Sequence, residues 1–344
     1  MERNYPDKEK WFDTTIYGGH FCAAKIIKGN GDENFDADKF INSEMGEKIL
    51  GRIMNELVVY GGQNWDHPDM IKWWADRGVK KTIYNAEDRA NAWITYVPDT
   101  IDTESGEKVP VVFCFHGGGG TLFESENHGF VHHCREGRYI VVCPENQNSD
   151  TKLCGNRIVY YLDQAEAQGL PVDRTRVYLT GMSMGGVASI YNSLAHNSEV
   201  AAIAAHSCGM ILERPTRFLE LTDEMFAASQ PMPMHLFIGQ NDFKQLPLAP
   251  AVIDGLNRYL KMDGCNATAA SSGNMVGITG DKVDEEIIDG ALHTTVRFNS
   301  PEYGNILNVT GIEGHPHWVS YSFAEIAWPF LSRFRRVNGK LELV

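Results

Sequence analysis

The stretch from Arg176 to Tyr191, RVYLTGMSMGGVASIY, constrains the fold of this chain more than any other. Its first residues suit a buried strand, and the residues from Met184 to Leu194 are small and apolar, as in a packed helix. Between them lies Gly181-Met182-Ser183-Met184-Gly185, a G-x-S-x-G pattern. The glycines let the chain turn sharply and lift the serine hydroxyl clear of the sheet. The pattern predicts a strained turn with Ser183 as candidate nucleophile and the Met184 N–H as an oxyanion donor, against the plainer interpretation of a glycine-rich turn.

Strands and helices alternate around this stretch, so we predict an α/β fold with a mostly parallel central sheet and helices on both faces. Two earlier strands, 81–86 and 91–98, are spaced for antiparallel pairing. The remaining predicted strands are 109–115, 139–144, 176–180, 201–207, 234–239, 294–298 and 305–309. The predicted helices are 40–57, 123–135, 156–168, 184–194, 216–228 and 322–336. Ligands of such sheets bind beyond the carboxyl ends of the strands, where the motifs below fall.

A glycine run, His116-Gly117-Gly118-Gly119-Gly120, follows the strand that ends at Phe115. Glycines allow a substrate to approach the backbone closely and can turn N–H groups toward it. We therefore predict that Gly117 or Gly118 supplies the second half of an oxyanion hole. A phosphate-binding loop is the alternative, but the Lys-Ser/Thr that would complete it is missing.

Asp242 follows the strand MHLFIG, downstream of the serine. A carboxylate at this point can accept the Nδ1–H of a histidine and fix its tautomer, whereas a solvated loop aspartate is the alternative. The order serine, acid, histidine along the chain is that of α/β-hydrolase triads. We predict Asp242 as the acid, with Asp281, Asp284 and Asp289 as alternatives.

Two histidines, in Gly314-His315-Pro316-His317-Trp318, compete for the role of general base. Proline fixes its own φ near −65° and restricts His315 to extended conformations, which favours His315 as loop support and His317 as the base. A metal pair is a further interpretation, but no cluster of ligands at metal-binding spacing accompanies them. We predict no metal and no cofactor.

These residues together resemble the α/β-hydrolase superfamily, and within it the polyhydroxybutyrate-depolymerase and feruloyl-esterase-like serine esterases, over roughly residues 109–334. The similar segments are HGGGG, CPEN (143–146), VDRTRVYLTGMSMGG, AAIAAHSCG, IGQND and the histidine-tryptophan segment. That family commonly has G-H-x-W where this chain has G-H-P-H-W. His315 follows a glycine, as the histidine of that family does. His317 instead lies at the family's distance from the upstream Ile312-Glu313-Gly314. The loop 264–292 and the N-terminal extension match nothing in the family.

The resemblance implies a carboxylic-ester hydrolase that works through an acyl-enzyme, with Ser183, His317 and Asp242 as its triad and Gly117, Gly118 and Met184 as oxyanion donors. The ester would be small or polymeric, of feruloyl, acetyl, hydroxyalkanoate or polyester type. A peptidase or amidase of the same fold is the first alternative. A non-catalytic binding protein on a hydrolase scaffold is the second. Neither the acyl group nor the oligomeric state follows from the sequence.

The 344 residues suggest two regions, an N-terminal extension (1–60) packed on a catalytic domain (61–344). A net charge of −14 argues against nucleic-acid or anionic-membrane partners. The N-terminus lacks the apolar core of a signal peptide, so we expect a cytoplasmic protein, or a secreted one if a signal peptide was removed. The seven cysteines are an odd number, which favours reduced thiols; a bridge among Cys134, Cys154, Cys208 or Cys265 would instead support secretion.

Overall fold

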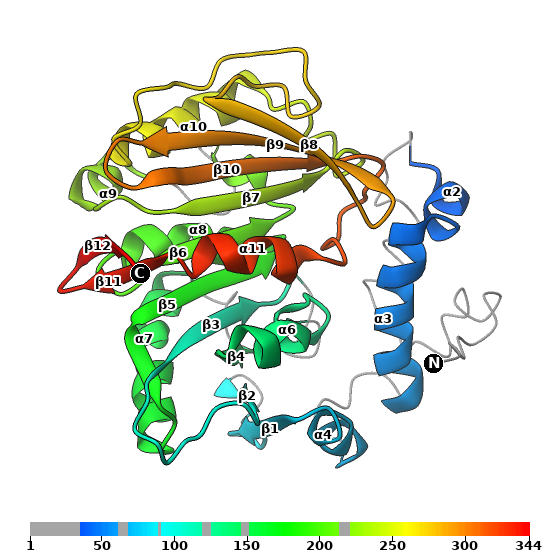
Figure 1. Ribbon diagram of the computed structural model, residues 1–344, viewed down its shortest axis with the longest axis vertical. Helices are drawn as coiled ribbons and strands as arrows, with labels where there is room; N and C mark the ends of the chain where they lie inside the picture. Colours follow the sequence, from blue (N-terminus) through cyan, green and yellow to red (C-terminus); the bar gives the residue numbers. More distant parts are fainter. Residues whose placement is uncertain (1–34, 61–67, 89–90, 119–124, 146–150, 213–220) are drawn as a thin grey trace.

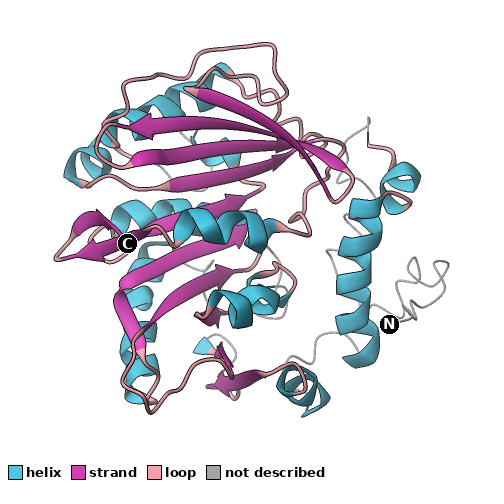
Figure 2. Ribbon diagram, viewed as in Figure 1, coloured by secondary structure: helices cyan, strands magenta, loops and turns pink. Residues whose placement is uncertain are grey.

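A twisted sheet with helices on both faces dominates the computed structural model, which describes residues 35–60, 68–88, 91–118, 125–145, 151–212 and 221–344 (Figures 1 and 2). Its strands are β1 (Val79–Tyr84), β2 (Trp93–Pro98), β3 (Val109–Phe115), β4 (Ile140–Pro144), β5 (Val172–Met182), β6 (Ala202–His206), β7 (Met234–Gly239), β8 (Lys282–Ile288), β9 (Ala291–Ser300) and β10 (Gly304–Ile312). Within the described ranges these ten strands form one sheet in the order β1-β2-β4-β3-β5-β6-β7-β10-β9-β8.

The centre of the sheet, from β4 to β10, is parallel, and β3, β4, β6 and β7 are buried at every position. Such strands must be apolar throughout because helices cover both of their faces. The helices are α2 (Ala37–Ile41), α3 (Glu44–Tyr60), α4 (Pro68–Ala75), α6 (Phe130–Gly137), α7 (Thr151–Ala167), α8 (Met184–Ala195), α9 (Asp223–Ala228), α10 (Pro250–Met262) and α11 (Phe323–Leu331). In Figure 1, α6 and α11 lie in front of the sheet, and α7, α8 and α10 lie behind it. The predicted fold class is confirmed.

Antiparallel strands flank the parallel centre on both sides. β1 pairs with β2, as the spacing of the first strands predicts, and β2 pairs with β4. On the far side, β9 and β8 extend the sheet beyond β10. The sequence analysis missed β8 because KVDEEII is rich in charge and lies at an edge, where most of its residues are exposed.

The predicted helix 322–336 is wrong over its last third, residues 332–336. α11 ends at Leu331, and residues Phe334–Val337 form strand β11, which pairs with β12 (Lys340–Leu343) in a separate hairpin. Arg336 is buried in β11 and donates from Nε to the carbonyl of Val200 at 3.0 Å. Alternate side chains of a strand point inward, and Arg336 occupies an inward position. Over so short a segment the sequence does not distinguish this alternation from the pattern of an amphipathic helix.

Four other predicted helices have different bounds. The predicted helix 156–168 corresponds to α7, which begins five residues earlier, at Thr151. The predicted helix 40–57 is two helices, because Asn42 caps α2 and Ser43 separates it from α3. The N-cap of α9 is Thr222, whose side chain accepts the Met225 N–H, and the helix begins at Asp223; residues 216–220 of the predicted helix lie outside the described residues. The start of α6 at Phe130 is later than predicted, and residues 123–124 of the predicted segment lie outside the described residues.

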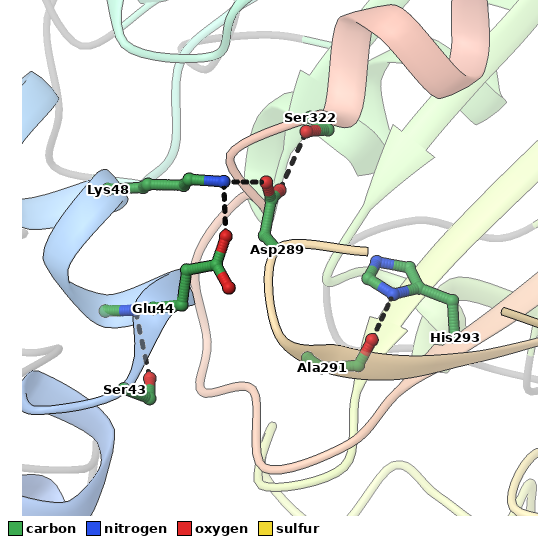
Figure 3. A network of polar contacts seen from close by, with 8 residues as sticks. Ser43, Glu44, Lys48, Asp289, Ala291, His293 and Ser322 are labelled. Atoms are coloured by element: carbon green, nitrogen blue, oxygen red, sulfur yellow. Dashed lines mark hydrogen bonds and ion pairs between the residues drawn. The ribbon is translucent and has the colours of Figure 1, made fainter. Parts of the chain in front are cut away.

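The N-terminal helix α3 contacts the turn between β8 and β9 through a small polar network (Figure 3). Lys48 Nζ lies 2.7 Å from both Glu44 Oε1 and Asp289 Oδ1. Asp289 Oδ2 also accepts a hydrogen bond from Ser322 Oγ, just before α11, at 2.7 Å. The side chain of Asp289 is only 7% exposed, so this ion pair is better shielded than a surface pair. We propose that the extension packs on the main domain through this contact; residues 1–34 lie outside the described residues.

Two further observations concern the cysteines and the helices of the described residues. Cys114, Cys134, Cys143, Cys208 and Cys265 are free thiols in the structure. Over the ranges given above, no helix has both the length and the apolar character that crossing a bilayer requires.

Candidate active site

Ser183 stands on a strained turn between β5 and α8. Its φ of 55° and ψ of −117° are rarely adopted by a residue with a side chain. The Ser183 N–H donates to the carbonyl of His206, at the end of β6, at 2.9 Å. Its side chain makes no capping hydrogen bond to α8. The hydroxyl is therefore not engaged by its own helix.

The glycines of the G-x-S-x-G pattern are required by close backbone contacts. A Cβ atom on Gly185 would lie 2.2 Å from the carbonyl oxygen of Phe115 and 2.6 Å from that of His116. A Cβ atom on Gly181 would lie 2.5 Å from the carbonyl carbon of Gly185. The end of β3, the turn and the start of α8 thus meet backbone to backbone, which any side chain would prevent.

His317 lies between Ser183 and Asp242. Its Nδ1 is 2.6 Å from Asp242 Oδ1, and its Nε2 is 2.9 Å from Ser183 Oγ. Because a carboxylate only accepts, Nδ1–H donates to Asp242, which leaves the Nε2 lone pair to accept the Ser183 hydroxyl. Asp242 is fully buried and His317 is 5% exposed. This arrangement can withdraw the serine proton and hold the imidazolium that results.

Neighbouring parallel strands bring these groups together. Asp242 follows β7 and His317 follows β10, and β7 and β10 pair in parallel, so both loops leave the same edge of the sheet. The loops also bind each other: the Asn241 N–H donates to the carbonyl of His315 at 2.9 Å, and the Gly314 N–H donates to Gln240 Oε1 at 2.9 Å. The acid and the histidine are therefore held by one joined pair of loops.

His315, the alternative base, points elsewhere. It is fully buried, and its Nδ1–H donates to the carbonyl of Pro316 at 2.8 Å. Its ring packs edge-on against Phe40 of α2, with centroids 5.9 Å apart. Burial lowers the pKa of His315 to about 4, which keeps the ring neutral near pH 7. The structure therefore brings His317 to Ser183 and keeps His315 within the loop packing.

The three alternative acids have partners outside this site. Asp281 accepts the N–H of Asn299 at 2.7 Å. Asp284 lies 2.6 Å from both Lys282 and Arg297, and these cations lower its pKa. Asp289 belongs to the Lys48 network shown in Figure 3.

The predicted oxyanion donors lie beside the serine. A Cβ atom on Gly118 would be 2.9 Å from Met184 Cγ, so the glycine loop runs against the first residue of α8. The His116 ring braces this loop, because its Nδ1 is 2.8 Å from the carbonyl oxygen of Gly117 and its Nε2 is 3.0 Å from that of Glu145. The donor roles of Gly117, Gly118 and Met184 stay predictions, and residues 119–124 lie outside the described part.

The sequence analysis missed two residues at this site. Phe243 is 45% exposed and packs on the His317 ring with centroids 4.5 Å apart. His206 lies at the end of β6. An aromatic residue directly after the acid, and a polar residue at the carboxyl end of a buried strand, are the signals that could have indicated them. As for metals, no group of three or more His, Cys, Asp or Glu side chains that could hold an ion occurs where the structure describes the chain.

Comparisons with known proteins give matches by structure only. No family model and no curated protein matches the sequence. The chain is similar in structure to an acetyl xylan esterase from Aspergillus awamori, at 12% identity and a TM-score of 0.51, over 73% of this chain and 99% of that one. It is also similar to the feruloyl esterase module from Clostridium thermocellum, at 13% identity and a TM-score of 0.43, over 74% of this chain and 86% of that one. At this identity the first likeness shows the fold alone, and the second is too weak to carry an argument.

Proposed function

We propose that this chain, which has the α/β-hydrolase fold, is a serine carboxylic-ester hydrolase that works through an acyl-enzyme. The observation that carries the proposal is the continuous contact from Asp242 Oδ1 through His317 to Ser183 Oγ, at 2.6 and 2.9 Å. The serine in this contact stands on a strained turn at the start of a helix. Nucleophile, base and orienting acid at these distances are what acyl transfer requires.

In the first half-reaction, Ser183 Oγ attacks the ester carbonyl while His317 Nε2 takes the hydroxyl proton. Buried Asp242 stabilises the imidazolium and holds its orientation. Charge develops on the carbonyl oxygen, where the N–H of Met184 and of Gly117 or Gly118 would donate hydrogen bonds. The attack produces a tetrahedral intermediate. This intermediate collapses to the acyl-enzyme as the C–O bond to the alcohol breaks and His317 returns the proton to the leaving oxygen.

In the second half-reaction, water replaces the alcohol. His317 takes a proton from this water as its oxygen attacks the acyl carbonyl, and then returns that proton to Ser183 Oγ as the acyl–oxygen bond breaks. The products are a carboxylic acid and free enzyme. Besides the ester and this water, these steps use side chains and backbone groups of the chain.

Acetyl esters are the first substrates to examine, because the structural neighbour with the higher TM-score is an acetyl xylan esterase. A set of p-nitrophenyl esters with graded acyl groups, from acetyl to feruloyl-sized, would define the acyl specificity. Matched p-nitroanilides would test the amidase alternative, which predicts turnover of anilides at a rate comparable with the esters.

The decisive variant is Ser183→Ala. Losing the nucleophile of such a triad lowers kcat on the order of a million-fold. The hydroxyl makes no capping bond, so we expect the circular dichroism spectrum and Tm to change little. A fluorophosphonate probe should label the wild type and not this variant. Retention of a tenth of the wild-type rate would refute the role of Ser183, and a wild type that neither labels nor turns over any ester would favour the binding-protein alternative.

A further inference from the structure

His206 joins the turn that carries the serine to the loop that carries the histidine. It is the last residue of β6 and is fully buried. Its backbone carbonyl accepts the Ser183 N–H at 2.9 Å, while its ring contacts the segment just after His317. We infer that His206 is a positioning residue that maintains the distance between Ser183 Oγ and His317 Nε2. This inference rests on the proposed function.

Both ring nitrogens of His206 are linked by hydrogen bonds to the segment just after His317. The backbone N–H of Ser320 donates to His206 Nε2 at 3.1 Å. On the other side, His206 Nδ1 is 2.9 Å from Ser207 Oγ, and Ser207 Oγ donates to the carbonyl of Trp318 at 3.2 Å. One imidazole thus holds the residues one and three positions after His317, directly on one side and through a hydroxyl on the other.

These contacts define the tautomer of His206. A backbone N–H can only donate, so Nε2 must carry the lone pair and the proton must reside on Nδ1. Nδ1–H then donates to Ser207 Oγ, whose own hydrogen is free to reach the Trp318 carbonyl. Burial, together with the neighbouring His315, His317 and His128, lowers the pKa of His206 well below its usual value. The neutral ring with its proton on Nδ1 is the form that satisfies every contact.

Packing fixes the plane of this ring. Phe237 of β7 lies nearly parallel to it with centroids 5.8 Å apart, and Phe323 of α11 meets it edge-on at 5.3 Å. Ser207 holds a φ of 59°, a conformation rarely adopted by a residue with a side chain, and its N–H donates to the carbonyl of Phe237 at 2.8 Å. Strained backbone persists only where surrounding contacts over-determine it. The ring can therefore shift little without disturbing the loop that it holds.

The consequence is a specific kinetic signature. A misplacement of about 1 Å between a nucleophile and its base can lower the rate on the order of a hundredfold. His206 is buried and bonded to the turn that carries Ser183, so its loss should affect the chemical step rather than ester binding. We expect His206→Ala to lower kcat by roughly 30- to 100-fold with KM within about twofold of wild type.

Two conservative variants separate the contacts. Glutamine can place an amide oxygen near the position of Nε2 and accept the Ser320 N–H. Asparagine can place an amide N–H near the position of Nδ1 and donate to Ser207. Each should recover part of the kcat lost in His206→Ala. Ser207→Ala removes only the second link with a minimal change in volume, and we expect a several-fold fall in kcat even if the alanine variant at 206 does not fold.

The matched control is His235→Gln. His235 is another histidine of the sheet, 3% exposed, and its Nε2 contacts Thr310 Oγ1 at 2.8 Å. Its ring stacks on Phe237, which also packs on His206, so this variant changes the packing next to His206 and none of the hydrogen bonds of His206. This variant should lose stability but keep kcat. All variants are assayed on p-nitrophenyl acetate at a temperature at which each is folded, and their fluorophosphonate labelling rates are compared. In ¹⁵N-labelled wild type, His206 should show a protonated Nδ1 and an unprotonated Nε2.

The outcomes separate this inference from the proposed function. If Ser183→Ala stays active in the same assays, the proposed function is wrong whatever the His206 variants do. If Ser183→Ala is inactive but folded His206→Ala or Ser207→Ala keeps wild-type kcat and labelling rate, His206 has no positioning role. A ring protonated on Nε2 would equally overturn the inference. A loss of kcat that is as large in His235→Gln would assign the effect to general destabilisation.

Discussion

Replacing the two histidines of the G-H-P-H-W segment one at a time should have very different effects on rate. His317→Ala removes the only imidazole within hydrogen-bonding distance of Ser183 Oγ among the described residues. His315→Ala removes a ring whose Nδ1 bonds to the next carbonyl in the chain and whose Nε2 has no partner in the described structure. The backbone carbonyl of His315, which accepts the Asn241 N–H, is retained in both variants.

The two magnitudes follow from these contacts. Without a base, kcat should fall on the order of a million-fold, which corresponds to about 8 kcal/mol of transition-state stabilisation. His317→Ala leaves the buried carboxylate of Asp242 without the partner of its Oδ1, and the lost ring is only 5% exposed, so Tm should fall in this variant too. His315→Ala empties a fully buried position, which costs on the order of 2–4 kcal/mol in the free energy of unfolding. With about 2.1 cal/mol/K of unfolding entropy per residue, 344 residues give about 1.4 °C per kcal/mol, so Tm should drop by about 3–6 °C, while kcat should stay within about tenfold of wild type.

The assay measures kcat and KM for p-nitrophenyl acetate at 20 °C beside a urea denaturation curve for each variant. His315→Phe is the control for volume, because it fills the position without an imidazole and should restore part of the stability. The reasoning is refuted if folded His315→Ala is the inactive variant and His317→Ala keeps substantial turnover. That result would mean that the loop rearranges so that the histidine next to the glycine serves as base.

Asp242→Asn should fold, but its kcat should fall roughly ten-thousand-fold, which is the size of this effect in serine proteases. The reason is that an amide at 2.6 Å from Nδ1 favours the wrong tautomer of His317. A near-normal kcat in the same ester assay would exclude Asp242 as the acid. Gly185→Ala should destabilise by about 3 kcal/mol or more, since its Cβ would lie 2.2 Å from a carbonyl oxygen of β3, whereas Gly273→Ala, with nothing within 4 Å of its Cβ, should leave the urea midpoint nearly unchanged. The pKa of His315 is about 4 in the folded protein and about 6.5 in the unfolded chain. Between these pH values the unfolded chain binds more protons than the folded protein. The free energy of unfolding therefore falls as the pH decreases through this window, by up to about 1.4 kcal/mol per pH unit. Denaturation at pH 7, 6 and 5 should therefore show a shallower decline for His315→Asn, and equal slopes would contradict a buried neutral ring.

The turn around Ser183 was predictable because the interactions that shape it are local or generic. A strand, a glycine-flanked serine and a helix follow one another within sixteen residues, and the backbone contacts of Gly181 and Gly185 explain why no other residue type fits. The parallel centre of the sheet was predictable for a similar reason, since strands covered on both faces are apolar throughout. Short, charged or edge elements such as β8 and β11 carry no such pattern, and these were missed.

Only the tertiary structure decided which groups meet. His315 and His317 are two residues apart and similar in chemistry, so their spacing left both open; the pairing of β7 with β10 and the bond from Asn241 to the His315 carbonyl turn one ring into the loop and the other toward the serine. The contacts of His206 could not be predicted from the sequence either, because its partner Ser320 is 114 positions away in the chain. A sequence pattern reports interactions between near neighbours and the general requirement for burial. Which distant polar atoms lie within 3 Å of one another depends on the register and packing of the whole sheet.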